Sequence, residues 1–324
     1  MTEPKTARRV LVTGAAGYIG TQLVRRLVSE ADVEFVVATD IRKPSVPQHS
    51  KLLVDVRDIR DPGLRDVLIA NRVDTVVHLA SVVTPPPGMS REEMYSIDVG
   101  GTRNVLDAAL SAAARRLVVS SSGAAYGYHP DNPEWIDEDA PLRGNESFAY
   151  SHHKRLVEEM LAEARRQYPE LVQLIFRFCT ILGPSVNNQI SALFEGRFVL
   201  GVAGSAAPFV FIWDEDVVEV LVRALWWPRS GIFNVAGDGA LPLPAIARRI
   251  GKPYVAVPRW LLEATLAVLH KLRLSQYGPE QVDFLAYRPV LANRRLKEEF
   301  GYTPRFTSEQ AFDLYWQARQ RQRS

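Results

Sequence analysis

The sequence predicts an α/β protein with a doubly wound parallel sheet, followed by a smaller mixed α/β region. Two observations lead to this class. Over the first half of the chain, short and nearly continuous apolar runs alternate with longer stretches of helical periodicity, which is typical of parallel strands covered by helices on both faces. After Gly183-Pro184, shorter elements and turns rich in glycine and proline replace this alternation. We therefore expect one domain over residues 1–180 and a substrate-binding region over residues 181–324, with some segments of the second returning to the first sheet.

Each element of the first half is expected from its own pattern. The strands are short runs rich in valine, leucine and isoleucine, at residues 9–13, 33–40, 52–54, 73–79, 116–121 and 171–178. Helices are expected where apolar residues recur at helical spacing, at residues 18–29, 62–71, 91–114 and 150–168. Proline-rich residues 84–88 predict a stiff loop directly after the fourth strand. Because ligands of doubly wound sheets bind outside the carboxyl ends of the strands, Thr84 is expected at the mouth of the site.

Composition and charge narrow the class of protein. The 324 residues carry a net charge of only +2, so no nucleic-acid partner is expected. The single cysteine, Cys179, excludes an internal disulfide, and no group of His, Cys and acids has metal-ligand spacing, so we expect no catalytic metal. The N-terminus lacks the pattern of a signal peptide, and no apolar run reaches the roughly 18 residues that span a bilayer. We expect a cytoplasmic protein in which residues 260–272 form a packed helix; a helix for a membrane surface or an apolar substrate is the alternative.

Three glycines form a G-x-x-G-x-x-G pattern between the first strand and the first helix, at Gly14, Gly17 and Gly20. Glycines in this context allow a tight turn and a close approach of the backbone to a pyrophosphate, which the helix N-terminus attracts. Asp40 ends the second strand, where a carboxylate accepts hydrogen bonds from a ribose diol and repels a 2′-phosphate. The pattern predicts a Rossmann-type NAD-binding domain. NADP is the less favoured cofactor, although Arg42 could accommodate its extra phosphate.

A second motif follows the fifth strand, where a serine-rich segment contains Ser122. Tyr150 and Lys154 come later, four residues apart on an expected helix, and side chains at this spacing share one helix face. The ammonium of Lys154 is therefore expected to lower the pKa of the Tyr150 phenol toward the working pH. Tyr150 would then serve as acid or base at a secondary hydroxyl or ketone, while the hydroxyl of Ser122 orients the same oxygen.

Together these motifs resemble those of the extended short-chain dehydrogenases/reductases, the NAD-dependent epimerase/dehydratase family. The resemblance covers nearly the whole chain and implies that Ser122, Tyr150 and Lys154 are catalytic. The fingerprint and the resemblance assign these residues to the cofactor: Gly14, Ala16, Gly17, Tyr18, Ile19, Gly20, Asp40, Asp55, Val56, Leu79, Ala80, Ser120, Tyr150 and Lys154. The residues assigned to the substrate are Thr84, Ser122, Gly123, Tyr150, Asn188 and Arg288. The resemblance also implies a homodimer that pairs through helices 91–114 and 150–168.

Several positions differ from the residues that are usual in this family, and these differences limit which reactions are expected. Gly123 and Ala124 stand where sugar dehydratases and decarboxylases carry acids, so neither of those reactions is expected. Nucleotide-sugar enzymes of this family use an arginine to hold the diphosphate where this chain has the neutral residues 205–209, and they usually have an asparagine where Thr180 stands. Both differences argue against a diphosphate site. Arg288 matches an arginine of those enzymes, so such a site stays possible. The leading interpretation is an NAD-dependent oxidoreductase that transfers hydride between the nicotinamide and a secondary hydroxyl or ketone carbon. A nucleotide-sugar 4-epimerase is the alternative, and a non-catalytic NAD(P)-sensing protein is a third.

Three further features allow two interpretations each. Asp98 stands where the family usually places asparagine, and it either alters a proton relay or only packs its helix. His152 and His153 are interpreted as surface or packing residues. The aromatic side chains of the second half either form its core or line a pocket for an apolar substrate; they are Phe194, Phe198, Phe209, Phe211, Trp213, Trp226, Trp227 and Trp260.

Overall fold

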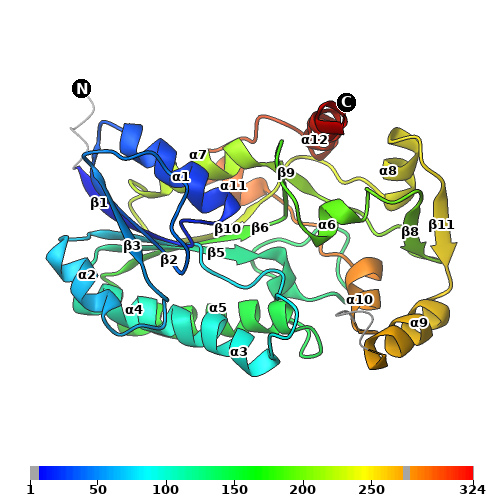
Figure 1. Cartoon of the computed structure of the whole chain (residues 1–324), viewed down its shortest axis with the longest axis horizontal. Coiled ribbons are helices and arrows are strands. Elements are labelled where there is room, and N and C mark those ends of the chain that lie inside the picture. Colours follow the sequence, from blue (N-terminus) through cyan, green and yellow to red (C-terminus); the bar gives the residue numbers. More distant parts are fainter. Residues whose placement is uncertain (1–6, 273–277, 324) are drawn as a thin grey trace.

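The computed structural model describes residues 7–272 and 278–323, and a seven-stranded parallel sheet forms its centre (Figure 1). The strand order is β10-β6-β5-β4-β1-β2-β3. The strands are β1 (Arg8–Thr13), β2 (Val33–Asp40), β3 (Leu52–Val56), β4 (Thr75–His78), β5 (Arg116–Ser122), β6 (Val172–Phe178) and β10 (Gly231–Val235). The order reverses between β1 and β4, which is where doubly wound sheets bind their ligands. The predicted fold class is confirmed.

Helices cover both faces of this sheet (Figure 1). One face carries α1 (Tyr18–Ser29), α7 (Asp214–Ala224) and α11 (Arg294–Glu298), and the other carries α2 (Leu64–Ala70), α4 (Thr102–Ser111) and α5 (Ala149–Gln167). Successive side chains of a strand point to opposite faces, so Val10 packs into the first of these cores and Leu11 into the second. Burial on both faces explains why the strands read as nearly unbroken apolar runs.

The long helix expected over residues 91–114 is interrupted. The structure has α3 (Arg91–Tyr95), then a π-helical turn over Ser96–Gly101, then α4. Such turns widen a helix locally and are frequent at functional sites. Apolar periodicity continues through the turn, so the sequence pattern could not reveal it. Its effect is to carry the acidic side chain of Asp98 into the interior, where it is 4% exposed.

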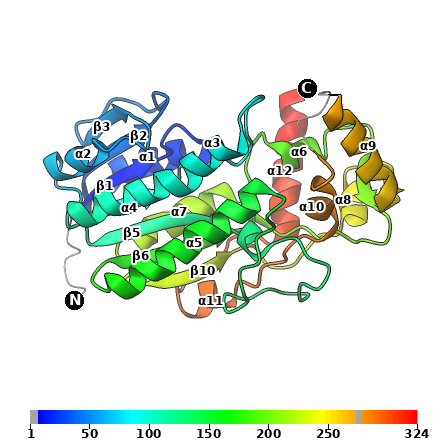
Figure 2. The same cartoon turned by 90° about the horizontal axis from the view of Figure 1, so that it is seen from below.

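The second half forms a smaller region beside the sheet (Figure 2). Two pairs of parallel strands lie here, β7 (Thr180–Leu182) with β9 (Phe211–Trp213) and β8 (Val199–Val202) with β11 (Tyr254–Val257). The helices of this region are α6 (Gln189–Ala192), α8 (Leu243–Arg249), α9 (Arg259–Lys271), α10 (Gln281–Ala286) and α12 (Ser308–Arg323). Its core contains Phe194, Phe209, Phe211 and Phe312. Both β10 and α7 come after Gly183 in the chain yet belong to the first sheet and its helical layer.

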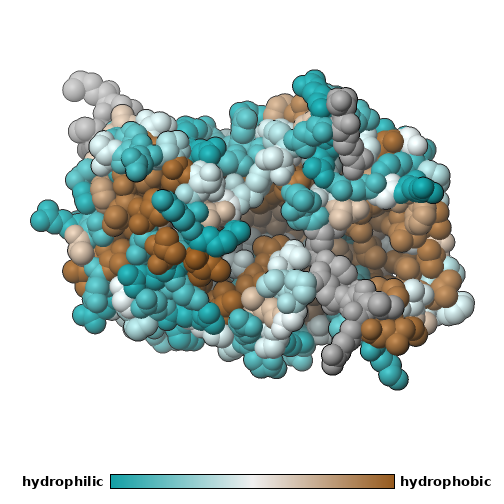
Figure 3. Space-filling model, in the orientation of Figure 1, coloured by the Kyte–Doolittle hydropathy of each residue, from teal (hydrophilic) through white to brown (hydrophobic). Residues whose placement is uncertain are grey.

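The helix expected to pack at residues 260–272 does so only in part, since Leu262 and Leu266 pack against a small buried cluster of Val202, Val282 and Ala286. No residue of α9 is buried, and Trp260 is 69% exposed. Figure 3 shows apolar side chains gathered over this end of the molecule, beside β11 and α9. The apolar spacing of this segment indicates a helix but does not distinguish a buried face from an exposed one. Within the part of the chain that the structure describes, no helix has both the length and the apolar character needed to cross a membrane.

Candidate active site

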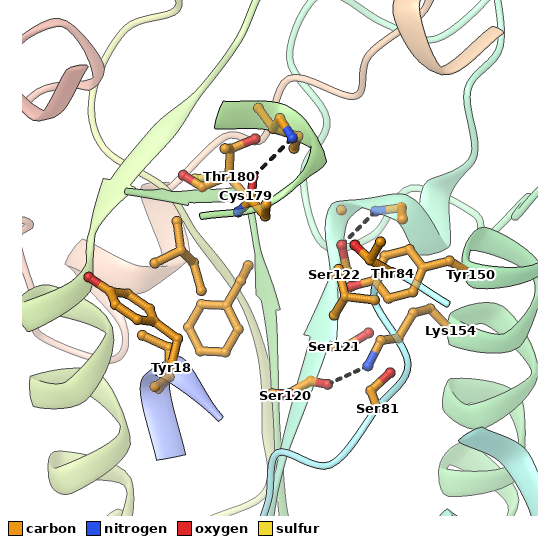
Figure 4. Close-up of a pocket in the computed structure, with 18 of the residues that line it drawn as sticks. Tyr18, Ser81, Thr84, Ser120, Ser121, Ser122, Tyr150, Lys154, Cys179 and Thr180 are labelled. Atoms are coloured by element: carbon orange, nitrogen blue, oxygen red, sulfur yellow. Dashed lines mark hydrogen bonds between the residues drawn. The ribbon is translucent and has the colours of Figure 1, made fainter. Parts of the chain in front are cut away.

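A cavity of about 590 Å³ lies between the carboxyl ends of the central strands and the second half of the chain. Figure 4 shows Tyr18 on one side of it and Ser122, Tyr150 and Lys154 on the other. The sequence-assigned residues that line it are Gly14, Gly17, Tyr18, Ile19, Gly20, Leu79, Thr84, Ser120, Ser122, Gly123, Tyr150, Lys154, Asn188 and Arg288. The assigned residues that do not line it are Ala16, Asp40, Asp55, Val56 and Ala80. This second group follows β1 and β4 or ends β2 and β3, along the same edge of the sheet.

The glycine loop brings β1, β4 and α1 into close contact. Gly14 has a φ of +69°, and a β-carbon there would lie 2.7 Å from the backbone nitrogen of Ala80. A β-carbon on Gly20 would lie 2.0 Å from the carbonyl oxygen of Gly14. Both positions therefore require glycine. Gly17 precedes α1 without a side-chain cap, which leaves the N–H groups of the first turn available to an anion.

Carboxylates end the two strands beyond β1. Asp40 accepts hydrogen bonds from the backbone nitrogens of Ala16 and Arg42, each at 3.0 Å, and so anchors the glycine loop from the side. Asp55 forms an ion pair with Arg57 at 3.0 Å. Val56 beside it is 58% exposed. Asp40, Asp55 and Val56 therefore lie at the carboxyl ends of β2 and β3, between the glycine loop and the edge of the sheet.

A buried chain of hydrogen bonds joins the glycine loop to the π-helical turn. Thr102 Oγ1 donates to the backbone oxygen of Asp98 (2.5 Å), so it accepts from His78 Nε2 at 2.9 Å. His78 Nδ1 in turn accepts from Thr13 Oγ1 (2.7 Å), which itself accepts from the backbone nitrogen of Leu79. Burial lowers the pKa of His78 to about 3, so the imidazole is neutral at physiological pH. His78 lies in the strand that the sequence predicted over residues 73–79, where nothing signals its hydrogen bonds.

Ser122, Tyr150 and Lys154 converge on the cavity (Figure 4). Ser122 Oγ accepts from the backbone nitrogen of Ala124 (3.1 Å), and the hydroxyl lies close enough to Tyr150 to act on the pKa of its phenol. Lys154 Nζ donates to the backbone oxygen of Ser120 (2.9 Å) and lies 5.6 Å from the centre of the Tyr150 ring. The i, i+4 spacing therefore places the two side chains on one helix face, as the sequence predicted.

The pKa of Tyr150 differs from the expectation. Burial raises it to about 12; the Ser122 hydroxyl opposes this and the charge of Asp98 adds to it. Burial also lowers the pKa of Lys154, while the charges of Asp98 and Glu158 raise it. The Lys154 ammonium is turned toward the Ser120 carbonyl rather than the phenol oxygen, and loss of hydration dominates at the phenol. Tyr150 is therefore a protonated phenol at neutral pH.

Beneath these residues, a buried ion pair fixes the end of β5. Arg177 on β6 binds Glu158 on α5 (2.7 Å), and Glu158 accepts a hydrogen bond from Ser121 (2.5 Å). Arg177 also donates to the hydroxyl of Tyr126 (2.6 Å). The network holds the segment that carries Ser122 against α5. Its members lie far apart in the chain, and no local motif signals it.

Aromatic side chains form the wall next to Tyr150. Tyr128, Phe148 and Phe284 pack together with ring centres 5.2–5.8 Å apart, and all three line the cavity. These are not the aromatics singled out from the sequence: Phe194, Phe209 and Phe211 are fully buried core, whereas Phe198 and Trp260 are exposed. Tyr128 follows the segment of Ser122 in sequence and Phe148 precedes Tyr150, which is the signal that could have identified them.

Arg288 brings a positive charge to the lining of the cavity. The guanidinium of Arg288 lies between the rings of Phe209 (4.0 Å) and Phe284 (4.5 Å), and its Nη2 donates to Thr180 Oγ1 (3.3 Å). Its Nη1 is buried and has no hydrogen-bond partner among the described residues. Burial lowers the pKa of Arg288 to about 10, so it stays charged at neutral pH. Asn188 also lines the cavity, but its side-chain oxygen caps α6.

This chain is similar to a known protein family, to relatives in sequence and to solved structures. A family model described as the NAD dependent epimerase/dehydratase family matches residues 10–236. An uncharacterized protein of Mycobacterium tuberculosis is 30% identical over 98% of this chain and 85% of its own length. The 3-diazoavenalumate denitrifying reductase of a Streptomyces species is 30% identical over 80% of this chain and 86% of the relative. The structure of MoeE5 in complex with UDP-glucuronic acid and NAD is similar with a TM-score of 0.74 and 25% identity, over 97% of this chain and 99% of MoeE5.

Proposed function

Because this chain belongs to the NAD dependent epimerase/dehydratase family, we propose that it is an NAD-dependent oxidoreductase that acts on a secondary hydroxyl or ketone. The observation that carries the proposal is the meeting of Ser122, Tyr150 and Lys154 at a cavity that the glycine loop also lines. A protein that only senses the cofactor has no need for a buried tyrosine and lysine at this place. The Tyr–Lys pair therefore argues for turnover.

The residues fit the cofactor. Gly14 and Gly20 have no side chain at two places where a β-carbon would collide with the neighbouring backbone. The loop can therefore be tight enough for a pyrophosphate to approach its backbone, and α1 begins beside it without a side-chain cap. The Asp40 carboxylate adjoins this loop and would repel a 2′-phosphate, which favours NAD over NADP. MoeE5 binds NAD, which supports the assignment. NAD, when bound, supplies the hydride acceptor or, in its reduced form, the hydride donor.

The chain's own residues supply the proton chemistry. The Tyr150 phenol holds its proton at neutral pH, so it is ready to give that proton to the oxygen of a ketone under reduction. Ser122 lies close to Tyr150 and orients the same substrate oxygen. The Lys154 amine lies 5.6 Å from the centre of the Tyr150 ring. In the oxidative direction, Tyr150 takes the proton of the substrate hydroxyl only after it has lost its own.

The lining of the cavity favours an apolar or aromatic substrate. Tyr128, Phe148 and Phe284 offer ring faces beside Tyr150, and Arg288 offers the positive charge at the far end. A relative that is a reductase supports simple oxidoreduction. Gly123 and Ala124 bring no acid or base to the site, so dehydration is not proposed.

A nucleotide-sugar 4-epimerase is the second candidate. The likeness to MoeE5, which binds UDP-glucuronic acid, is the observation that favours it, and Arg288 could hold one phosphate. Against it, residues 205–209 bring no positive charge to the site, and Ala207 and Phe209 are buried in the core.

Replacement of Tyr150 by phenylalanine tests the proposed role. We expect Tyr150→Phe to bind NAD with an unchanged dissociation constant, because the ring is kept. Its turnover should fall by roughly 10²–10⁴-fold, because the proton donor is lost. Binding is measured by calorimetry, and turnover by NADH oxidation against a panel of aryl and alkyl ketones. Tyr168→Phe, at the exposed end of α5, is the matched control. Full activity in Tyr150→Phe would show that another group is the acid.

A further inference from the structure

Arg288 is a cation at the cavity that the proton chemistry does not use. Its guanidinium carbon lies 4.0 Å from the ring centre of Phe209 and 4.5 Å from that of Phe284. Its Nη2 donates to Thr180 Oγ1 at 3.3 Å, whereas its Nη1 is buried and unbonded among the described residues. Aromatic rings therefore hold the side chain in place, while much of the hydrogen-bonding capacity of the guanidinium stays unused.

The described part of the fold supplies no counter-ion for this charge. The titratable groups that face Arg288 are Tyr128 and Cys179, and burial raises the pKa of both, so both are neutral at physiological pH. The described residues that line the cavity include no aspartate or glutamate. A buried charge is costly unless an opposite charge meets it. The charge of Arg288 is therefore matched only when a ligand brings an anion.

The aromatic wall connects Arg288 with the proposed acid. Phe284 packs against Phe148 with ring centres 5.8 Å apart, and Phe148 packs against Tyr150 with ring centres 6.4 Å apart. Figure 4 shows Thr180, which accepts from the guanidinium, on another side of the cavity from Tyr150. A substrate whose reacting carbon lies at Tyr150 would thus reach Arg288 along ring faces, with its anionic group remote from that carbon.

The surroundings of the guanidinium favour a carboxylate over a phosphate. A carboxylate carries a single negative charge, which one guanidinium balances, whereas a phosphate ester carries nearly twice that charge. Lys154, the other cation among the described lining residues, donates to the Ser120 carbonyl and lies beside Tyr150. A carboxylate is also flat, so it can meet the edge of a guanidinium whose faces are occupied by aromatic rings.

We propose that the substrate is an aromatic or apolar ketone or alcohol with a remote carboxylate, which binds Arg288 while the reacting carbon lies at Tyr150. The carboxylate accepts from guanidinium N–H groups that Thr180 leaves free, and the body of the substrate lies along Phe284 and Phe148. The inference rests on the proposed function for the reaction at that carbon. The binding of a carboxylate at Arg288 can be measured without it.

A matched pair of ligands tests the charge at this place. 4-Acetylbenzoate and 4-acetylbenzamide have nearly the same shape, with a ketone opposite the acid or the amide, and only the first is an anion. We expect calorimetry on the NAD-saturated natural protein to show roughly 10–100-fold tighter binding of the benzoate, as charge-assisted hydrogen bonds provide. In Arg288→Gln the two ligands should bind equally, because the positive charge is lost. Arg197→Gln removes an exposed charge outside the cavity and should keep the natural preference.

Equal binding of the two ligands to the natural protein would overturn the proposal. Tighter binding of 4-acetylphenyl phosphate than of 4-acetylbenzoate would overturn it as well, because the site would then be one for phosphate. Both comparisons use the natural protein, so they decide the question even if Arg288→Gln does not fold, which circular dichroism establishes.

Turnover separates this inference from the proposed function. In Arg288→Gln, the KM for reduction of 4-acetylbenzoate should rise roughly 10–100-fold with little change in kcat, because the lost contact is remote from the reacting carbon. Reduction of neutral ketones without any preference for the acid would refute the carboxylate site and leave the oxidoreductase. Tight binding of the acid without reduction of any ketone would support the carboxylate site and refute the proposed function.

Discussion

At the scale of single residues, the sequence predicts which side chains share a helix face, but it does not predict how deeply each side chain is buried or which distant groups surround it. Tyr150 and Lys154 share a helix face because they are four residues apart, and this relation is local. The pKa of Tyr150 depends instead on burial, which the distant elements around it create. The same holds for His153, whose position on the helix did not reveal that Asp98 would meet it. The sequence therefore predicted which side chains meet at the cavity, but not the burial that raises the pKa of Tyr150.

His78 allows a residue-scale prediction about pH. Its folded-state pKa of about 3 lies below the ordinary value of 6.5, so between these values the unfolded chain binds more protons than the folded one. The stabilisation due to the neutral imidazole is thus complete above about pH 6.5 and is lost as the pH falls toward 3. We expect His78→Gln to cost about 1–3 kcal/mol of the free energy of unfolding at pH 8, through the hydrogen bonds to Thr13 and Thr102.

The dependence of the free energy of unfolding on pH shows whether His78 is held neutral in the fold. Urea unfolding across pH 8 to 4 should show a shallower loss of stability in His78→Gln than in the natural sequence. His270→Gln, at an exposed position of α9, should retain the natural slope. Equal slopes in all three proteins would mean that His78 is not held neutral in the fold.

At the scale of elements, the sequence predicted the alternation of strands and helices because each has its own apolar period. It did not predict the π-helical turn at Ser96–Gly101, because apolar residues continue on both sides of the turn and read as one helix. The glycine loop was predictable because its chemistry is local. Its tightness depends on contact between β1, β4 and α1, which only the fold brings together.

Two glycine substitutions separate a required glycine from a tolerated one. Gly20→Ala puts a β-carbon 2.0 Å from the Gly14 carbonyl oxygen, so α1 must move away from the loop. We expect a loss of about 3 kcal/mol in the free energy of unfolding and weakened NAD binding. Gly100→Ala meets no atom within 4 Å and lies in a helical turn, so it should be neutral or stabilise by up to about 1 kcal/mol. Denaturant unfolding and calorimetry measure both effects, and equal behaviour of the two variants would contradict this account of the loop.

At the scale of the whole molecule, the cavity is formed where two parts of the chain meet. The sequence predicted a site at the carboxyl ends of the strands from the fold class alone. It did not predict the aromatic wall, because Tyr128 and Phe284 are far apart in sequence and are brought together only when α10 folds over the site. Substrate preference is thus a property of the assembled molecule, which is why motifs left an oxidoreductase and an epimerase both open.

Binding of UDP to the NAD-saturated protein decides between these two functions. A ligand present at 100 times its dissociation constant stabilises a fold by about 2.7 kcal/mol, which raises the melting temperature by several degrees. We expect millimolar UDP to cause no more stabilisation than uridine, because Arg288 is the one cationic side chain at the far end of the cavity in the described structure and residues 205–209 bring none. A clear shift with UDP alone would favour the epimerase. Its loss in Arg288→Gln would then show that this guanidinium, the one held between Phe209 and Phe284, binds the diphosphate.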